Sequence, residues 1–261
     1  MSRRGLLMMP APWAVLSWPV RPWPIDARRL PDQRVVSRRS EIPAFPLVGP
    51  SHAHRSMPNI AVIDFETTGM RVGQDRIIEV GAAILEDGQV VATFSELMDP
   101  GFRIPGFITS LTGISTAMVR GKPRPEVVMP RLRAFLGDRP CVAHNAAFDQ
   151  RFFSAEMTLA GEGHDREFFC SVLLARRLIY QAPSHRLGDL ASHLGLTMPP
   201  GMRAHRALAD VLITCQLWIH LRQRLQERLG GRKADLDLVR TVMRKPKAGV
   251  DRYLADLAAA G

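Results

Sequence analysis

The sequence predicts an α/β fold, a mixed β-sheet flanked by helices, and three observations lead to it. Residues 60–64, 76–86 and 89–98 form three apolar runs with the character of strands. The turn Glu86-Asp87-Gly88 joins the second run to the third as a hairpin, so these two strands are expected to be antiparallel. From residue 141 onward a short strand is followed by helical segments. A meander followed by strand and helix in alternation is typical of a mixed sheet covered by helices.

The individual elements follow from the spacing of apolar residues and from the residues that end them. Residues 60–64 have the pattern of a buried central strand that ends in Asp64, and residues 141–143 that of a very short strand. Glycines at 195 and 230–231 end two of the expected helices. The predicted helices cover residues 125–136, 148–160, 171–181, 187–194, 204–229, 235–244 and 249–260.

Residues 1–56 differ in composition from the rest of the chain. They hold nine of the 20 prolines and three of the four tryptophans, and they show no helical or strand period. Such a segment cannot bury enough apolar surface to offset the entropy lost on ordering, so we expect it to be disordered. Met57 stands directly before the first strand, and a translation start there is an alternative explanation. We therefore expect a Pro/Arg-rich N-terminal segment (1–56), a folded domain (57–229) and a helical tail (230–261).

The chain of 261 residues is basic, with 35 Lys and Arg against 25 Asp and Glu and a formal net charge of +10. Residues 1–56 hold nine arginines and three acids, so they carry +6 of this charge and the rest carries +4. A basic protein suits a polyanionic partner, because neutralised phosphates release bound counterions. The three cysteines form no CxxC pair, and no apolar run approaches the about 20 residues of a membrane span. We expect reduced thiols and a cytoplasmic protein.

The first candidate functional element is Asp64-Phe65-Glu66-Thr67-Thr68-Gly69, at the end of the first strand. Alternate residues of a strand share a face, so the carboxylates of Asp64 and Glu66 can converge on one point. Two neighbouring acids repel each other unless a cation lies between them, which favours Mg²⁺ or Mn²⁺ at this place. Taken alone, the segment is better explained as a solvated strand end followed by a turn, because D-x-E after an apolar run is common.

Two further acids stand where helices begin. In residues 144–149 (HNAAFD), Asn145 is a credible helix cap and Asp149 falls in the first turn, where an acid also suits the helix dipole without any other role. In residues 205–210 (HRALAD), Asp210 comes five positions after His205, too far round for the two to share one helical face. We therefore place His205 in the loop before the long helix, over the same cleft as Asp210.

The ordered set of these motifs resembles the DEDDh family of 3′→5′ exonucleases. Within that family it is similar to the epsilon proofreading subunits of bacterial DNA polymerase III, with which DFETTGM, HNAAFD and HRALAD all agree. Residues 111–114 (LTGI) and 187–196 also resemble those proteins, and the likeness covers roughly residues 59–229. The resemblance implies an RNase H-like fold with a five-stranded mixed sheet flanked by helices, and so an exonuclease domain over residues 57–229.

The resemblance also implies roles for individual residues. Two Mg²⁺ or Mn²⁺ ions would be bound by four carboxylates: Asp64, Glu66, Asp149 and Asp210. His205 would be the general base for the attacking water, a task that suits histidine because this residue type titrates near neutral pH. Thr67 is expected near the 3′-terminal nucleotide, and Phe148 either lines the nucleotide pocket or, as an equal alternative, packs in the core. The expected product is a nucleoside 5′-monophosphate.

Three functions are compatible with these motifs. A proofreading-like enzyme would trim single-stranded or frayed DNA ends, and HNAAFD favours this branch. An RNA- or oligonucleotide-trimming exonuclease would use the same five residues. A non-catalytic nucleic-acid-binding module would be favoured by the loss of a carboxylate or of the histidine, and none is lost. The expected partner is a nucleic acid with a free 3′ end, DNA before RNA, and both service to a DNA polymerase and independent action stay open.

Overall fold

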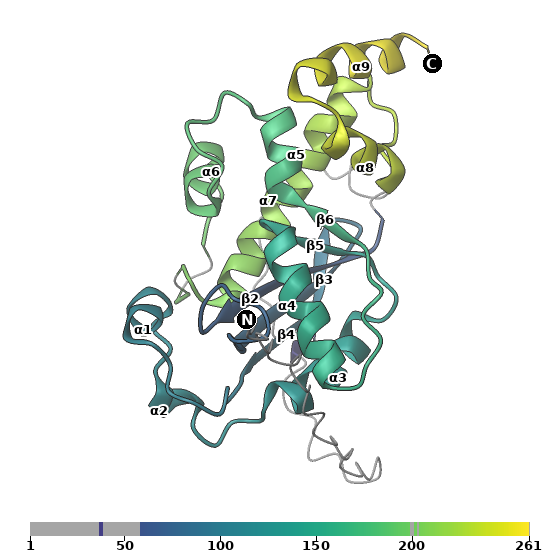
Figure 1. The fold of residues 1–261 in the computed structure, drawn as a ribbon. Coiled ribbons are helices and arrows are strands. Elements are labelled where there is room, and N and C mark those ends of the chain that lie inside the picture. The colour runs from purple at the N-terminus through teal and green to yellow at the C-terminus, as the bar shows by residue number, and fades with distance from the viewer. Residues whose placement is uncertain (1–36, 39–57, 199–200, 203, 261) are drawn as a thin grey trace, which may run out of the picture. The chain divides into compact units, whose positions relative to one another are not determined.

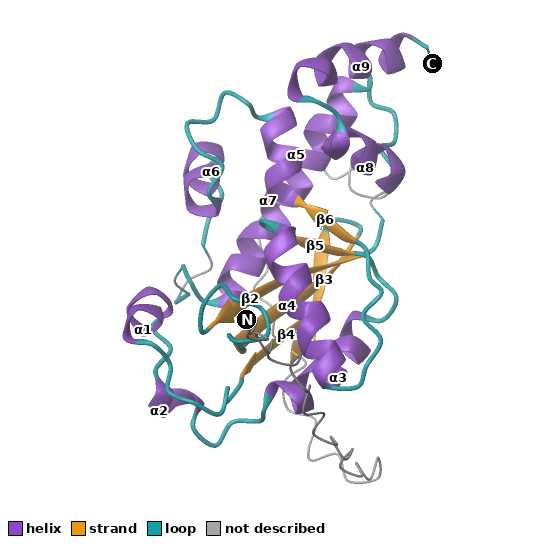
Figure 2. Cartoon of the chain, viewed as in Figure 1, coloured by secondary structure: helices purple, strands orange, loops and turns teal. Residues whose placement is uncertain are grey.

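The computed structural model describes residues 37–38, 58–198, 201–202 and 204–260 (Figure 1). The expected five-stranded mixed sheet is confirmed, in the order β4-β3-β2-β5-β6 (Figure 2). Three antiparallel strands form the meander: β2 (Ile60–Thr67), β3 (Ile77–Glu86) and β4 (Gln89–Leu97). Next to β2, the sheet continues with two short parallel strands, β5 (Cys141–Ala143) and β6 (Phe168–Cys170). The last of these, β6, was not among the strands expected from residue patterns.

Strand β2 is longer than its apolar run predicted. It stays paired with β3 as far as Thr67, with one irregularity in register between Glu66 and Thr67. Asp64 and Glu66 therefore lie within the strand and not at its end, because main-chain pairing with β3 continues beneath the polar residues. Their cross-strand partners are Gly81 and Glu79, and residues paired in this way share one face of the sheet.

The predicted helices are confirmed with small shifts at their ends, and they flank the sheet (Figure 2). Those of the main body are α3 (Pro125–Leu136), α4 (Ala146–Leu159), α5 (Ser171–Leu178), α6 (Leu187–Leu194) and α7 (Ala207–Arg228). Two short helices, α1 (Gly106–Thr112) and α2 (Thr116–Val119), lie where no helix was expected. They are too short to show a period, and Ser115 begins α2 by accepting a hydrogen bond from the Met118 amide.

One expectation about helix capping was wrong. Asn145 does stand at the N-cap of α4, but its side chain makes no capping hydrogen bond. Its φ angle of 74° places it in the left-handed region, where asparagine is better tolerated than most residues. Asn145 is therefore needed here for its backbone conformation, which lets the chain turn sharply from β5 into α4.

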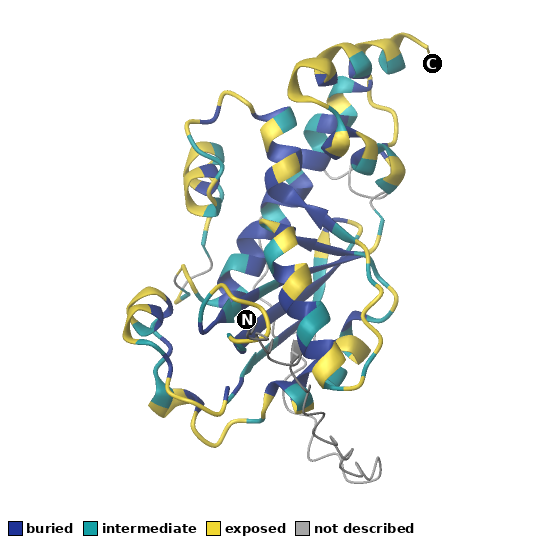
Figure 3. Ribbon diagram, in the orientation of Figure 1, coloured by how far each residue is buried: buried dark blue, intermediate teal, exposed yellow. Residues whose placement is uncertain are grey.

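The hydrophobic core surrounds the central strands, as the burial colours of Figure 3 show. Residues 77–85 of β3 are all buried, which is the pattern of a strand covered on both faces. Helix α7 packs on β2, β3 and β4, while α3 and α4 pack on each other and on the sheet. Strand β3, on which α7 packs most extensively, is therefore buried at the centre of the core.

The expected helical tail is present as α8 (Leu236–Arg244) and α9 (Lys247–Ala259), which pack against α5 and α7. Val239, Val242 and Val250 belong to the same buried cluster as the sheet. The buried guanidinium of Arg222 on α7 donates hydrogen bonds to the main-chain carbonyls of Ala234 and Asp235. Residues 230–260 are thus part of the main core and not a separate body.

Residues Ser37–Arg38 form a two-residue strand, β1, that pairs antiparallel with the outer edge of β4. They fall within the segment for which disorder was expected, and for these two residues the expectation is wrong, since β4 offers them an unpaired strand edge. The rest of residues 1–56 lies outside the described ranges. Cys141, Cys170 and Cys215 are buried free thiols. In the described part of the chain, every helix is too short or too polar to cross a membrane.

Candidate active site

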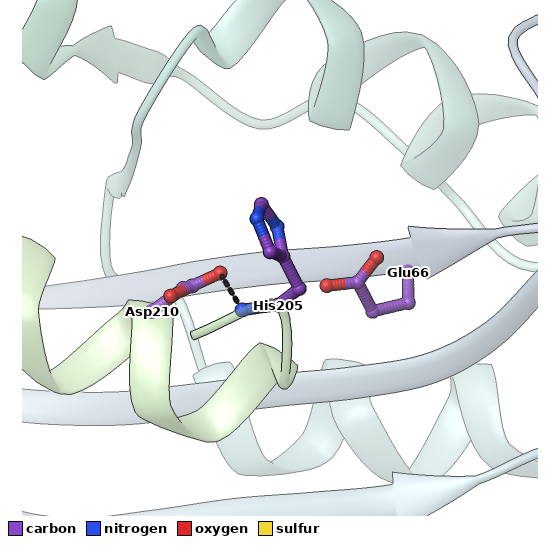
Figure 4. Close-up of side chains that lie close together, drawn as sticks. All are labelled: Glu66, His205 and Asp210. Carbon is purple, nitrogen blue, oxygen red and sulfur yellow. Dashed lines mark hydrogen bonds between the residues drawn. The ribbon is translucent and has the colours of Figure 1, made fainter. Parts of the chain in front are cut away.

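Three side chains from distant parts of the sequence meet at one point. Glu66 comes from β2, His205 from the loop before α7, and Asp210 from the first turn of α7 (Figure 4). One potential metal-ligating atom from each of them lies within 4.8 Å of those of the other two. The structure thus brings together residues of the first and third motifs, which are more than a hundred positions apart.

The second motif reaches the same place through the backbone of β2. Asp149, in the first turn of α4, is buried, and its Oδ1 accepts a hydrogen bond of 3.3 Å from the amide of Phe65. Phe65 stands between Asp64 and Glu66, so the carboxylate of Asp149 lies against the segment that carries both. Asp64 and Asp149 are outside the group of atoms within 4.8 Å, but Asp64 is close enough to Asp149, Asp210 and Glu66 for their charges to act on it.

Burial, with a smaller contribution from neighbouring charges, raises the pKa values of all four carboxyl groups. Burial, followed by the charges of Asp149 and Asp210, raises the pKa of Asp64 well above its ordinary value. Burial and the charge of Asp210 raise the pKa of Glu66 to about 8. Burial also raises the pKa of Asp149 to about 8, although hydrogen bonds from main-chain amides oppose it. Burial raises the pKa of Asp210, against the influence of His205.

His205 lies outside the helix, as its distance from Asp210 predicted. Its φ angle of 59° belongs to the left-handed region, so the chain turns at this residue before α7 begins at Ala207. The His205 amide donates a hydrogen bond of 3.2 Å to Oδ2 of Asp210, drawn as the dashed line in Figure 4. The imidazole is exposed and stands beside Glu66, where it can contact a bound water or substrate.

Two residues that sequence reasoning did not single out hold the start of α7 on the sheet. Glu79 is buried on β3, and its carboxylate accepts hydrogen bonds from Nε (3.1 Å) and Nη2 (2.6 Å) of Arg206. The amide of Ala207 also donates to Glu79, at 3.0 Å. Because Arg206 makes no side-chain cap of its own, Glu79 acts as the cap of α7 from a neighbouring strand. An acid inside an otherwise apolar strand was the signal that could have revealed it.

Gly81 explains how close α7 comes to the sheet. A Cβ added at this residue would stand 2.6 Å from the carbonyl oxygen of Ala207, so any side chain would push the helix away. Gly81 is also the cross-strand partner of Asp64. The first turn of α7 therefore rests directly on the strand next to the carboxylates, which sets the distance between Asp210 and β2.

The two candidate substrate contacts are placed differently from the five residues above. The hydroxyl of Thr67 is buried and donates to the carbonyl of Gly69 at 2.5 Å, which shapes the turn after β2. Phe148 is half-buried against the core, with its ring centroid 4.9 Å from that of Phe152. The described residues that line the open cleft beside the site include His205 and Asp210, but neither Thr67 nor Phe148.

The donor set suits a hard divalent cation. Carboxylate oxygens are the ligands that Mg²⁺ and Mn²⁺ prefer. The four carboxyl groups have raised pKa values, which shows that no positive charge nearby is sufficient to keep them ionised. A cation placed among them would favour the ionised form of each. The site therefore fits the metal ions that the resemblance implied.

Comparison with known proteins gives a consistent result. The family model RNase_T, described as "Exonuclease", matches residues 61–218, more than half of the chain. The chain is 34% identical over 206 residues to the PolC-type DNA polymerase III of Clostridium perfringens, which covers 79% of this chain and 14% of that protein. It is 32% identical over 170 residues to the DNA polymerase III subunit epsilon of Aquifex aeolicus, which covers 65% of this chain and 83% of that subunit.

The fold also matches a solved nuclease. The structure of Exonuclease X in complex with 5′ overhanging duplex DNA superposes with a TM-score of 0.56 and 29% identity. The match covers 70% of this chain and 99% of that one. The chain thus spans nearly all of Exonuclease X but only about one seventh of the PolC-type polymerase.

The raised pKa values predict that metal binding is linked to proton release. At pH values between the ordinary carboxyl pKa and about 8, Glu66 and Asp149 keep their protons in the metal-free protein. A cation that binds there must displace these protons. The affinity for Mg²⁺ should therefore rise with pH and level off above about pH 8. The number of protons released on metal binding should be much smaller at about pH 9 than at about pH 6.5. Isothermal titration calorimetry in buffers of different ionisation enthalpy measures both quantities.

The Asp149→Asn variant is the matched control, because it removes one of the titrating carboxyl groups and keeps the size of the side chain. It should release fewer protons than the wild type at the lower pH. Equal proton release by the wild type at both pH values would contradict the raised pKa values.

Proposed function

Because the chain belongs to the exonuclease family RNase_T and is therefore a nuclease, we propose that it removes nucleotides one at a time from 3′ ends of DNA. The observation that carries this proposal is the meeting of Glu66, His205 and Asp210, with Asp149 bound to the strand between the first two carboxylates. Asp210 and His205 line an open cleft, and Glu66 lies beside them. We expect a strand end to reach this point more readily than the interior of a paired duplex, because the terminal nucleotide can be unpaired at the smallest cost.

The reaction proposed for the site is hydrolysis of the terminal phosphodiester. The oxygen of a water molecule forms a bond to phosphorus, and the bond between phosphorus and the 3′ oxygen of the penultimate nucleotide breaks. His205 accepts the proton of the attacking water, because its ring is exposed and stands over the carboxylates. The departing 3′ oxygen takes up a proton from water, so the products are a nucleoside 5′-monophosphate and a strand that is one nucleotide shorter and ends in a 3′ hydroxyl.

Asp64, Glu66, Asp149 and Asp210 would hold two divalent cations, Mg²⁺ or Mn²⁺, which when bound supply Lewis acidity to the attacking water and to the leaving oxygen. The carboxylates themselves do two things. In the metal-free protein Glu66 and Asp149 hold protons below about pH 8, and bound cations would displace them. The bond from the Phe65 amide to Asp149 also fixes the direction of one acceptor before substrate arrives. Catalytic competence would thus begin with metal binding.

DNA is favoured over RNA by the kind of relatives that the chain has. The two proteins with 34% and 32% identity are named as a DNA polymerase III and as its epsilon subunit. They also support a DNA polymerase as the partner whose primer ends the enzyme trims. The RNA-trimming alternative uses the same five residues and is decided by the substrate test below.

We also propose that residues 57–229 carry the activity and that residues 230–261 stabilise them. A chain that starts at Met57 loses, among the described residues, only the two-residue strand β1. It should melt at the temperature of the full chain and cleave at the same maximal rate. A chain that ends at residue 229 should have a lower melting temperature. Its core residues that pack against Val239 become exposed to solvent, and Arg222 loses its main-chain carbonyl acceptors. Thermal melts and rates of the two truncated chains test this directly.

The substrate proposal predicts an order of rates. A terminal nucleotide must be unpaired to reach the site, and unpairing costs a few kcal/mol, least at a mismatch. Single-stranded ends should be trimmed fastest, mismatched ends next and paired ends slowest, with RNA ends slower than DNA ends. Release of mononucleotides from matched 3′-end-labelled oligomers in Mg²⁺ measures all of these rates in one assay.

Each comparison in that assay decides a separate point. Equal rates on paired and unpaired ends would rule out the need for fraying. A faster reaction on RNA would move the protein to the RNA-trimming branch. Absence of mononucleotide release from any oligomer would remove the proposed activity altogether.

The proposed role of His205 predicts a loss of turnover without a loss of fold. His205→Ala should lower kcat by about 10²–10⁴-fold, the usual effect of a positioned proton acceptor. The melting temperature should change little, because the ring is exposed. A variant whose kcat and pH profile match those of the wild type would leave His205 with a purely structural role.

A further inference from the structure

Two arginines line the same cleft as the candidate catalytic residues. The cleft has a volume of about 1230 Å³, and His205 and Asp210 lie along it together with Arg176 and Arg186. Arg176 belongs to the last turn of α5, and Arg186 is the N-cap of α6. These two helices follow each other in the sequence (Figure 1). The cleft therefore has an acidic part at the start of α7 and a part with cationic side chains on α5 and α6.

Neither of these guanidinium groups takes part in holding the fold. Both side chains are exposed, and within the described ranges neither has a hydrogen bond or an ion pair. Arg177, the next residue on α5, is the contrast. Its Nε and Nη2 donate to the carbonyl of Lys245 at 3.2 and 3.1 Å, and its Nη1 donates to the carbonyl of Leu173. One arginine of the pair thus ties down the tail, while the other faces the cleft.

The wall between the two arginines is ordered by buried contacts. His144 contacts the hydroxyl of Ser171 through Nδ1 (2.9 Å) and the carbonyl of His185 through Nε2 (3.0 Å), which links the start of α5 to the residue before Arg186. Burial, assisted by the nearby charges of His185 and Arg176, lowers the pKa of His144 to about 4, so this ring stays neutral at physiological pH. One acid, Asp189, also lines the cleft. The charge of the wall therefore comes mainly from the two arginines.

We propose that Arg176 and Arg186 bind phosphate groups of the substrate strand on the 5′ side of the bond that is cleaved. This inference rests on the proposed function, since it assigns the path of the strand whose 3′ end lies at the carboxylates. The guanidinium fork matches the oxygens of a phosphate and keeps its charge at every working pH. A cationic groove that follows the backbone is also the usual way in which proteins bind single strands without reading their sequence.

The size and polarity of the cleft agree with this path. Pockets for one small molecule commonly measure about 300–1,000 Å³, so this cleft has room for more than the terminal nucleotide. The arginine end attracts phosphates whether or not cations are bound, whereas the carboxyl end offers them no positive charge until cations bind there. A strand entering with its upstream phosphates on the arginines would present its 3′ end to Glu66, His205 and Asp210.

The test is the dependence of kcat/KM on salt for a single-stranded oligothymidylate of about ten nucleotides. Each phosphate contact adds about 0.7 to the slope of log affinity against log salt for single strands. The slope should fall by about 0.7 in Arg176→Ala and in Arg186→Ala, and by about 1.4 in the double variant, between about 50 and 200 mM salt. Arg252→Ala is the matched control, because it removes the same charge from an exposed arginine of α9 that lies outside the cleft lining.

A second substrate separates this inference from the proposed function. The p-nitrophenyl ester of thymidine 5′-monophosphate has one diester and no upstream phosphate. In the double variant, the ratio of kcat/KM on the oligomer to kcat/KM on the ester should fall well below the ratio for the wild type. If the wild type cleaves both substrates and the double variant keeps the salt slope and the ratio of Arg252→Ala, the path along the arginines is wrong and the nuclease proposal stands. If the wild type cleaves neither substrate, the proposed function itself fails.

Discussion

The active site depends on one constraint, the direct contact between the first turn of α7 and strand β3. Gly81 leaves no side chain between the strand and the carbonyl of Ala207, and Glu79 accepts hydrogen bonds from the Ala207 amide and the Arg206 guanidinium. His205 comes just before this anchor and Asp210 one turn after it. One contact therefore places two functional side chains opposite Glu66, and a shift of α7 would move both at once.

The buried acids of the molecule fall into two groups with opposite surroundings. Glu156 is paired with Arg76, whose guanidinium also reaches Glu126 and so connects α3 and α4 with the loop after β2. Glu79 is paired with Arg206. In the part of the chain that the structure describes, the four clustered carboxylates have no salt bridge, and their pKa values are raised. The fold pairs its structural acids with arginines, whereas the charge of the site acids is left for a bound cation to balance. Keeping these acids together lowers the stability of the fold, and burial of the apolar interior of the sheet must offset this cost.

Local patterns were sufficient for the features that depend on neighbours in sequence. The apolar runs predicted the meander, and alternation predicted that Asp64 and Glu66 share a face. The separation of five positions from His205 to Asp210 predicted a histidine outside the helix. Contacts between distant residues were not readable in this way. Glu79 and Arg206 are 127 positions apart, and nothing in either segment specifies the other. The backbone role of Asn145 was hidden as well, because the same residue type also caps helices through its side chain.

The left-handed backbone of His205 has a consequence for how this site evolves and how it is studied. A residue with a Cβ loses roughly 1–2 kcal/mol in that conformation, and glycine does not. Replacing the histidine with glycine would thus relieve strain while removing the imidazole, and asparagine would have a smaller effect of the same sign. Selection for thermal robustness alone would drive this position away from histidine. A library screened only for folding would therefore enrich variants that lack the imidazole. A substitution that raises stability at this residue would be expected to lower activity.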